Sequence, residues 1–168
     1  RVDVLINNAG VLKASQSICS NGLDVRFVVN TLAPLLLTKR LLKIMSPDAR
    51  VVNVSSAAQA SVSIAALEGK EQLEDMPAYS QSKLAMIMWN NHLARINPQG
   101  PVFISLNPGS LLATKMVKEG FGIEGKDSDI GANILVRSAL SDDFDEANSL
   151  YFDNDAEAFG RAHPDAYD

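Results

Sequence analysis

Along this chain, short apolar runs that end in small or amide side chains alternate with long helical patterns. This alternation is the feature that limits the fold most. Val2 to Asn7, Arg50 to Val54 and Pro101 to Leu106 are nearly uninterrupted apolar runs. Such runs are typical of strands buried on both faces of a parallel sheet. Strands that alternate with helices predict an α/β fold with a doubly wound parallel sheet, in which Val2 to Asn7 is a central strand.

The helical patterns lie between and after these strands. Pro34 lies inside the first of them, Leu23 to Met45. Because proline has no N–H, the carbonyl of Asn30 loses its helical donor, so we expect a kink and a free Asn30 carbonyl. Ser110 to Lys126 contains three glycines and is expected to be a mobile covering loop. The other expected elements are helices over Pro77–Ile96 and Asp129–Leu140, a loop or short helix over 59–76, and a last strand over Ser149–Phe152.

Length and composition predict one domain over residues 1–168. A chain of 168 residues with 46% hydrophobic content can bury one sizeable core. The net charge of -5 argues against a nucleic-acid or anionic-lipid partner. Cys19 is the only cysteine, which excludes an internal disulfide and favours a cytoplasmic location. No apolar stretch approaches the ~20 residues that cross a bilayer, so no membrane span is predicted.

Metal catalysis is not predicted either. His92 and His163 have no neighbouring Cys or His in the sequence, and are expected on a helix surface and in the tail.

Tyr79 and Lys83 lie four positions apart near the start of the predicted helix Pro77–Ile96. One helical turn brings both side chains onto the same face. A tyrosine with an ordinary pKa of about 10 is a poor acid or base at neutral pH, whereas a fixed ammonium beside it favours the phenolate. Tyr79 is therefore a candidate proton-transfer group. A chance pair in a helix remains the alternative when these two residues are considered alone.

Five motifs follow one another along the chain: Asn-Asn-Ala-Gly, Asn30, Ser56, Tyr79 with Lys83, and Pro108-Gly109. On these motifs the chain resembles the short-chain dehydrogenase/reductase family from Val2 to about Phe152. The resemblance implies a Rossmann-like fold and roles for four residues. Tyr79 would be the catalytic acid/base and Ser56 would polarise the substrate carbonyl. Lys83 would lower the pKa of Tyr79 and hold the nicotinamide ribose, and Asn30 would anchor a water in a proton relay.

The same resemblance implies a nicotinamide cofactor, NADP or NAD, with NADP slightly favoured. Hydride transfer needs such a cofactor, with a proton donor and a carbonyl-polarising group beside it. Asn8, Ala9 and Gly10 resemble the turn that lines the adenosine half, and Ser55 is expected to present its backbone to the cofactor. The stretch that grips the nicotinamide is represented by Pro108, Gly109, Leu111 and Thr114.

Two departures from the family pattern limit these expectations. No glycine-rich strand-turn-helix, which cradles the pyrophosphate, precedes Asn-Asn-Ala-Gly, and the chain starts at Arg1 without an initiator methionine or signal peptide. We therefore expect a fragment that holds the catalytic half of the fold. The interval from Ser56 to Tyr79 is longer than usual and is similar to the retinol-dehydrogenase and protochlorophyllide-reductase branch. Four residues separate Gly109 from Thr114, where three are commoner in the family.

Three functions remain open from the sequence. The first is an NAD(P)-dependent oxidoreductase acting on an alcohol or carbonyl compound. The second is a noncatalytic scaffold of the same fold that binds a nucleotide or a protein, since one fold hosts many functions. The third is a sugar-nucleotide epimerase, for which the chain after Gly109 leaves little room. The helices Leu23–Met45 and Tyr79–Ile96 are apolar around much of their circumference, so a homodimer or tetramer packed through them is expected.

Overall fold

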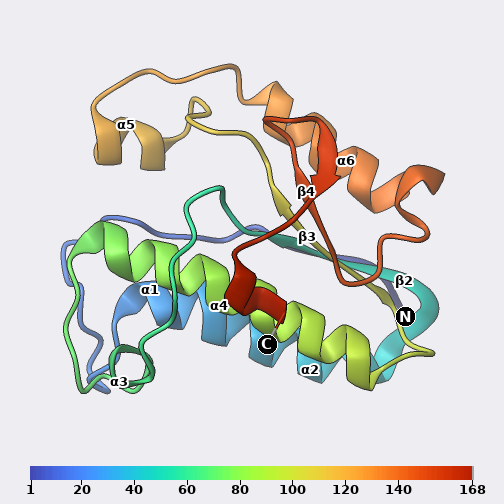
Figure 1. Cartoon of the computed structure of the whole chain (residues 1–168), viewed down its shortest axis with the longest axis horizontal. Coiled ribbons are helices and arrows are strands. Elements are labelled where there is room, and N and C mark those ends of the chain that lie inside the picture. Colours follow the sequence, from blue (N-terminus) through green and yellow to red (C-terminus); the bar gives the residue numbers. More distant parts are fainter. Residues whose placement is uncertain (168) are drawn as a thin grey trace.

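A computed structural model describes residues 1–167 and shows one five-stranded sheet in the order β1-β2-β3-β4-β5 (Figure 1). Neighbouring strands from β1 to β4 are parallel, and β5 runs antiparallel to β4. This topology confirms the predicted α/β fold with a mainly parallel sheet. The strands are β1 (Val2–Asn7), β2 (Met45–Val54), β3 (Val102–Asn107), β4 (Leu150–Asp153) and β5 (Ala158–Gly160).

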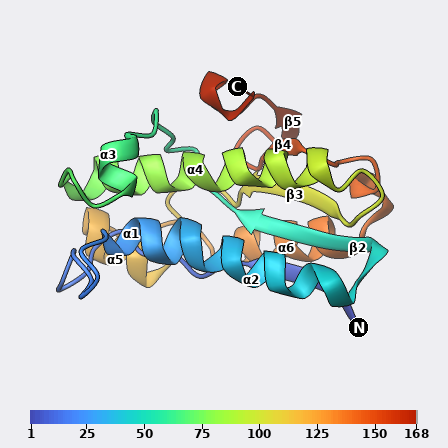
Figure 2. The same ribbon diagram turned by 90° about the horizontal axis from the view of Figure 1, so that it is seen from below.

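Helices cover both faces of the sheet, as a doubly wound arrangement requires. Two long helical segments, α2 (Ala33–Leu41) and α4 (Asp75–Ile96), lie on one face, and α6 (Asp129–Leu140) lies on the other (Figures 1 and 2). The shorter helices are α1 (Val25–Phe27), the π-helix η1 (Val28–Leu32), α3 (Ile64–Leu67), α5 (Lys115–Phe121), and the 3-10 helices η2 (Leu42–Ile44), η3 (Asp142–Phe144) and η4 (Pro164–Tyr167).

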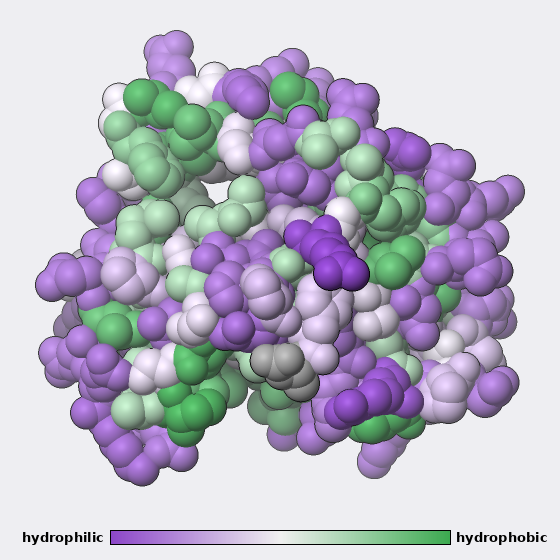
Figure 3. All heavy atoms as spheres, in the orientation of Figure 1, coloured by the Kyte–Doolittle hydropathy of each residue, from purple (hydrophilic) through white to green (hydrophobic). Residues whose placement is uncertain are grey.

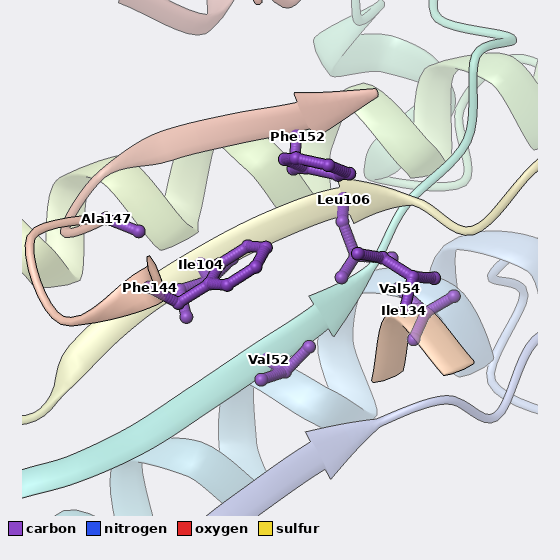
Figure 4. Packing of buried hydrophobic residues seen from close by; sticks show 8 residues of the cluster. All are labelled: Val52, Val54, Ile104, Leu106, Ile134, Phe144, Ala147 and Phe152. Atoms are coloured by element: carbon purple, nitrogen blue, oxygen red, sulfur yellow. The ribbon is translucent and has the colours of Figure 1, made fainter. Parts of the chain in front are cut away.

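The core follows the two-residue period of the strands. Side chains on the α6 face form one buried cluster, shown in Figure 4: Val52, Val54, Ile104, Leu106, Ile134, Phe144, Ala147 and Phe152. The alternate residues Val51 and Phe103 point to the other face and pack with Met86 and Trp89 of α4. Because both faces are buried, the apolar runs show no polar alternation.

A row of buried amides ties the sheet to its helices. Asn7 Nδ2 donates to Thr38 Oγ1 at 3.1 Å and to Asn53 Oδ1 at 2.7 Å. Asn53 Nδ2 donates in turn to Asn90 Oδ1 at 2.8 Å. Buried polar groups that are satisfied in this way allow few alternative packings. The row therefore helps to set how α2 and α4 lie against β1 and β2.

β1 is the first strand of the described sheet and lies at one end of it. Within residues 1–167 it pairs with β2 alone and forms the edge of the sheet. Leu5 is half-buried and Ile6 is 38% exposed. The prediction that β1 is a central strand supposes further strands that precede Arg1 and pair with its other edge. Residues 1–167 do not test this supposition, so it stays a prediction.

Pro34 changes the helix type rather than producing a simple kink. The residues before it form the π-helix η1, in which the N–H of Ala33 donates to the carbonyl of Val28, five residues earlier. Proline supplies no N–H to the ordinary ladder, and an i→i+5 bond is one way to re-pair the backbone around it. The helical region also ends earlier than predicted, because β2 starts at Met45.

The segment Ser110–Lys126, predicted as a loop, contains the helix α5. The side chain of Thr114 caps this helix by accepting from the N–H of Val117 at 3.3 Å. Gly122 ends it with φ 70°, a left-handed conformation that glycine adopts without strain. Leu112 and Lys126 form a parallel bridge that closes the base of the segment.

Among residues 1–167, no helix combines the length and the apolar character needed to cross a membrane.

Candidate active site

The side chain of Lys83 marks the point where the predicted site residues meet. It is only 3% exposed, and its Nζ donates to the carbonyl of Val54 at 2.8 Å, at the carboxyl end of β2. A methyl group built on Gly10 would lie 3.3 Å from the same Nζ. The structure therefore brings together the turn after β1, the end of β2 and the first half of α4, where open parallel sheets bind ligands.

Tyr79 and Lys83 lie on one face of α4, as predicted from their spacing. Lys83 Nζ is 5.7 Å from the centroid of the Tyr79 ring. Burial raises the pKa of the Tyr79 phenol, and the nearby Ser56 side chain lowers it only in part. Burial also lowers the pKa of Lys83 to about 8. In this structure the Lys83 ammonium bonds the Val54 carbonyl, and burial disfavours the charged forms of both groups, so the predicted stabilisation of a phenolate by Lys83 stays a prediction.

The two serines after β2 have different surroundings. Ser55 is 3% exposed, and its hydroxyl donates to the carbonyl of Lys83 at 2.9 Å. Ser56 is half-buried, and its side chain lies close enough to the Tyr79 phenol to lower the pKa of that group in part. Its Oγ also accepts from the N–H of Ala58 at 3.1 Å. Ser56 is therefore the serine beside Tyr79, in line with the choice made from the sequence, whereas Ser55 joins β2 to α4.

The side chain of Asn30 is fully buried and bridges two segments. Its Oδ1 accepts from the N–H of Val11 at 2.8 Å, and its Nδ2 donates to the Val11 carbonyl at 2.9 Å. The same Nδ2 donates to Ser82 Oγ at 2.9 Å. Asn30 therefore holds the segment after β1 against α4. Its predicted part in a proton relay stays a prediction.

The turn that follows β1 passes close to two buried polar side chains. Asn8 and Ala9 are exposed, while Gly10 lies against Lys83 and Asn30. A methyl group at Gly10 would approach Lys83 Nζ to 3.3 Å and Asn30 Oδ1 to 3.4 Å. Glycine thus lets the backbone approach these two polar groups closely.

The loop after β3 carries the other predicted cofactor residues. Gly109 has φ 119° and Leu111 has φ 57°, so both adopt backbone conformations that most residues avoid. The carbonyl of Pro108 accepts from Asn154 Nδ2 at 2.9 Å. Leu111 is 41% exposed, and the Thr114 hydroxyl caps α5. A hydrogen bond therefore holds this loop at the Pro108 carbonyl, whereas the side chain of Leu111 is exposed to solvent.

Several residues at the site were not predicted from the sequence. Tyr151 donates its hydroxyl to the Ser56 carbonyl at 3.2 Å, and Gln59 Nε2 donates to the same carbonyl at 2.9 Å. Asp155 accepts from the N–H of Ser110 at 3.0 Å and from Asn107 Nδ2 at 2.8 Å. Burial acts to raise the pKa of Asp155, but these hydrogen bonds outweigh it and hold the pKa below its ordinary value. Tyr151 and Asp155 come from segments far from the catalytic motifs in the sequence, so no spacing links them to those motifs, whereas Gln59 lies three positions after Ser56.

Two cavities differ in their relation to these residues. One, of about 260 Å³, lies next to Ser56 and is lined by Ala57, Gln59, Tyr151, Asp153, Arg161, Ala162 and His163. The other, of about 560 Å³, lies along the second half of α4, between Leu35 and Tyr167, and includes none of the predicted site residues. Predicted site residues line neither cavity, but the smaller one is lined by Ala57, which follows Ser56, and by Gln59 and Tyr151, which bond the Ser56 carbonyl. Figure 3 also shows an opening between the lobe formed by α5, where apolar side chains gather, and the rest of the molecule.

Comparison with known proteins gives the family. A family model described as short chain dehydrogenase matches residues 1–122, which include every predicted site residue. Retinol dehydrogenase 12 of Mus musculus is 32% identical over 165 residues, 90% of this chain and 52% of the mouse protein. Polyprenol dehydrogenase of Homo sapiens is 31% identical over 92% of this chain and 53% of the human protein. The chain thus spans about half the length of these relatives.

Solved structures agree with this result. A short-chain dehydrogenase from Escherichia coli CFT073, complexed with NADPH, has a TM-score of 0.67 and 25% identity, covering 92% of this chain and 63% of that one. The predicted likeness to the retinol-dehydrogenase branch is confirmed by the relatives. The family model matches most of this chain, and a relative is 32% identical to it over 90% of its length. The chain therefore belongs to the short-chain dehydrogenase/reductase family.

Proposed function

We propose that this chain carries the catalytic residues of an NAD(P)-dependent oxidoreductase that acts on an alcohol or carbonyl compound. The observation that supports this best is the convergence of three segments on Lys83. Its buried Nζ lies against Gly10 and the Tyr79 ring, and the Ser56 side chain acts on the pKa of the Tyr79 phenol. Nothing in the packing of a scaffold requires an ammonium, a phenol and a hydroxyl to be gathered at the carboxyl end of a parallel sheet.

The residues present fit a nicotinamide cofactor, which supplies or accepts the hydride when bound. Gly10 leaves a cradle that a side chain would fill, next to a lysine Nζ that can donate further hydrogen bonds. Asn8, Ala9 and the loop from Pro108 to Thr114 flank this cradle as its proposed walls. We place NADP before NAD because the Escherichia coli relative is complexed with NADPH.

In the reducing direction, the Ser56 hydroxyl donates to the substrate carbonyl oxygen and polarises the C=O bond. The Tyr79 phenol would give its proton to the oxygen while the carbonyl carbon receives the hydride that the cofactor, when bound, would supply, so that an alcohol forms and Tyr79 is left as a phenolate. The raised pKa of Tyr79 keeps the phenol protonated at neutral pH, which suits a proton donor. Lys83, 5.7 Å from the ring, then stabilises the phenolate until solvent returns the proton.

Deuteride transfer tests this proposal directly. The full-length protein is incubated with a carbonyl compound and NADPH that carries deuterium at the transferred position, and the product is analysed by mass spectrometry. Retinal is the first substrate to try, because retinol dehydrogenase 12 is among the relatives. We expect one deuterium on the former carbonyl carbon. Protein that binds NADPH but labels no aldehyde or ketone would favour the noncatalytic scaffold instead.

We also propose a homo-oligomer that packs through α2 and α4. Leu36, Leu37 and Ile44 at the α2 side are 53%, 46% and 51% exposed, and Ile96 at the end of α4 is 55% exposed. Burying such side chains would contribute about 25 cal/mol for each Å² removed from water. Sedimentation equilibrium over a tenfold range of concentration decides this point, since a monomer throughout would exclude it. The predicted cytoplasmic location stays a prediction.

A further inference from the structure

Arg26 is a buried guanidinium that joins three separate parts of the chain. Its side chain is 1% exposed. Nε and Nη2 donate to the two carboxylate oxygens of Asp24, at 2.8 and 2.6 Å. Nη1 donates to the carbonyl of Leu12 at 3.3 Å and also to the carboxylate of Asp75. One side chain thus connects the segment after β1, the start of α1 and the start of α4.

The two outer partners of Arg26 adjoin the proposed catalytic residues. Asp75 is the first residue of α4, and Tyr79 follows one helical turn later. Leu12 lies two positions after Gly10, whose backbone approaches Lys83. Figure 2 shows α1 running beside the first half of α4, which is where this connection is made.

Asn30 makes a parallel connection one turn further along the same helical region. It holds the backbone of Val11 and donates to Ser82 Oγ at 2.9 Å, and Ser82 Oγ donates to the Tyr79 carbonyl at 2.7 Å. Arg26 holds the carbonyl of the residue that follows Val11. Two neighbouring backbone groups are therefore attached to α4 on either side of Tyr79.

Stability alone is a poor explanation for this arrangement. Removing an arginine and a carboxylate from water costs free energy that the ion pair often fails to recover, and apolar replacements are frequently as stable. Arg26 also bonds a second carboxylate, Asp75, whose side chain is 46% exposed. A planar guanidinium with several fixed donors is, however, well suited to hold three groups in one geometry.

We propose that Arg26 is a positioning residue that, through Asp75 and Leu12, holds the first turn of α4 and the segment after Gly10 in the relative placement that proton transfer by Tyr79 needs. This inference rests on the function proposed above. Small displacements of reacting groups are costly, since an error of about 1 Å can reduce a rate about 100-fold.

A second ion pair in the chain offers a matched control. Arg50 is 8% exposed, donates to the Ser138 carbonyl at 3.1 Å and pairs with Asp145, whose side chain is 60% exposed. Like Arg26, Arg50 combines a backbone carbonyl with a partly exposed carboxylate. It connects β2 to the segment around α6 and touches neither α4 nor the turn at Gly10.

The experiment compares Asp75→Ala with Asp145→Ala in the full-length protein. Both substitutions leave a buried arginine with other partners, so both variants should fold and melt at similar, slightly lowered temperatures. We expect kcat for carbonyl reduction to fall about tenfold in Asp75→Ala, with KM for the carbonyl compound nearly unchanged. Asp145→Ala should keep the kcat of the unaltered protein. Asp75→Glu, which restores a carboxylate, should recover most of the lost rate.

Amide hydrogen exchange gives a readout that does not depend on activity. In Asp75→Ala, exchange should accelerate together at Val11 and in the first turn of α4, and it should not do so in Asp145→Ala. Unchanged exchange at Val11, or an equal loss of kcat in both variants, would overturn the inference. If the unaltered protein transfers no hydride, the proposed function fails, and the exchange data alone then support or overturn the role of Arg26.

Discussion

Lys83 Nζ lies 5.7 Å from the centroid of the Tyr79 ring but donates its hydrogen bond to the Val54 carbonyl, at 2.8 Å. The ammonium is therefore near the phenol without bonding its hydroxyl in this structure. Burial acts on both groups, raising the pKa of Tyr79 and lowering that of Lys83. Two of the predictions below follow from this relationship.

Replacing Tyr79 by phenylalanine removes the proposed proton donor and keeps the ring that packs near Lys83. Turnover should fall at least about 100-fold, the usual contribution of a general acid, while affinity for NADPH changes little. Steady-state kinetics and NADPH titration measure the two quantities. Tyr167→Phe in the tail, where the hydroxyl accepts from the N–H of Ala162, is the control. If the Tyr79→Phe variant keeps most of its activity, Tyr79 is not the proton donor.

Lys83 should make stability rise with pH above about 8. Its pKa is lowered from 10.5 to about 8 in the fold, so between these values the unfolded chain binds more protons than the folded one. The free energy of unfolding should therefore increase over this window, on the order of 3 kcal/mol in full. In Lys83→Met this increase should vanish.

Urea unfolding of both proteins at pH 7.5, 8.5 and 9.5 measures the difference, and the Lys83→Met protein corrects for the tyrosines, which begin to ionise near the top of this range. The two stability curves would run parallel if Lys83 were not the group responsible.

Replacing Ser56 should lower the reaction rate, whereas replacing Ser55 should lower the stability of the fold. Ser56→Ala removes the proposed donor to the substrate oxygen and should cost about 2 to 4 kcal/mol of transition-state stabilisation, with little effect on melting. Ser55→Ala breaks the bond to the Lys83 carbonyl and should lower the free energy of unfolding by about 1 kcal/mol. Kinetics and thermal melts of both variants provide the comparison. A normal rate in Ser56→Ala would contradict its assignment.

Gly10→Ala should weaken cofactor binding by filling the proposed cradle. The added methyl group would meet Lys83 Nζ at 3.3 Å and Asn30 Oδ1 at 3.4 Å, and overpacking of this kind typically costs about 1 to 3 kcal/mol. Isothermal titration with NADPH should show a higher Kd. Gly160→Ala in β5 is the control, since no heavy atom lies within 4 Å of its methyl position. Equal Kd values for the two variants would place the cofactor elsewhere.

The sequence alone predicted the features that depend on the spacing of residues within one element and on the order of motifs along the chain. The apolar runs predicted a parallel α/β sheet because residues buried on both faces show no polar alternation. The spacing of Tyr79 and Lys83 predicted a shared face because a helix repeats every 3.6 residues. The order of the motifs led to the family that the comparisons then showed.

Tertiary structure decided what depends on contacts between distant segments. It placed β1 at the edge of the described sheet, and it directed Lys83 to Val54 rather than to the Tyr79 hydroxyl. It also joined Arg26 to Asp75 across most of the first half of the chain. No local pattern encodes such pairs, because a side chain takes its partner from whichever groups the fold leaves within its reach, and burial then sets the charge that it can carry.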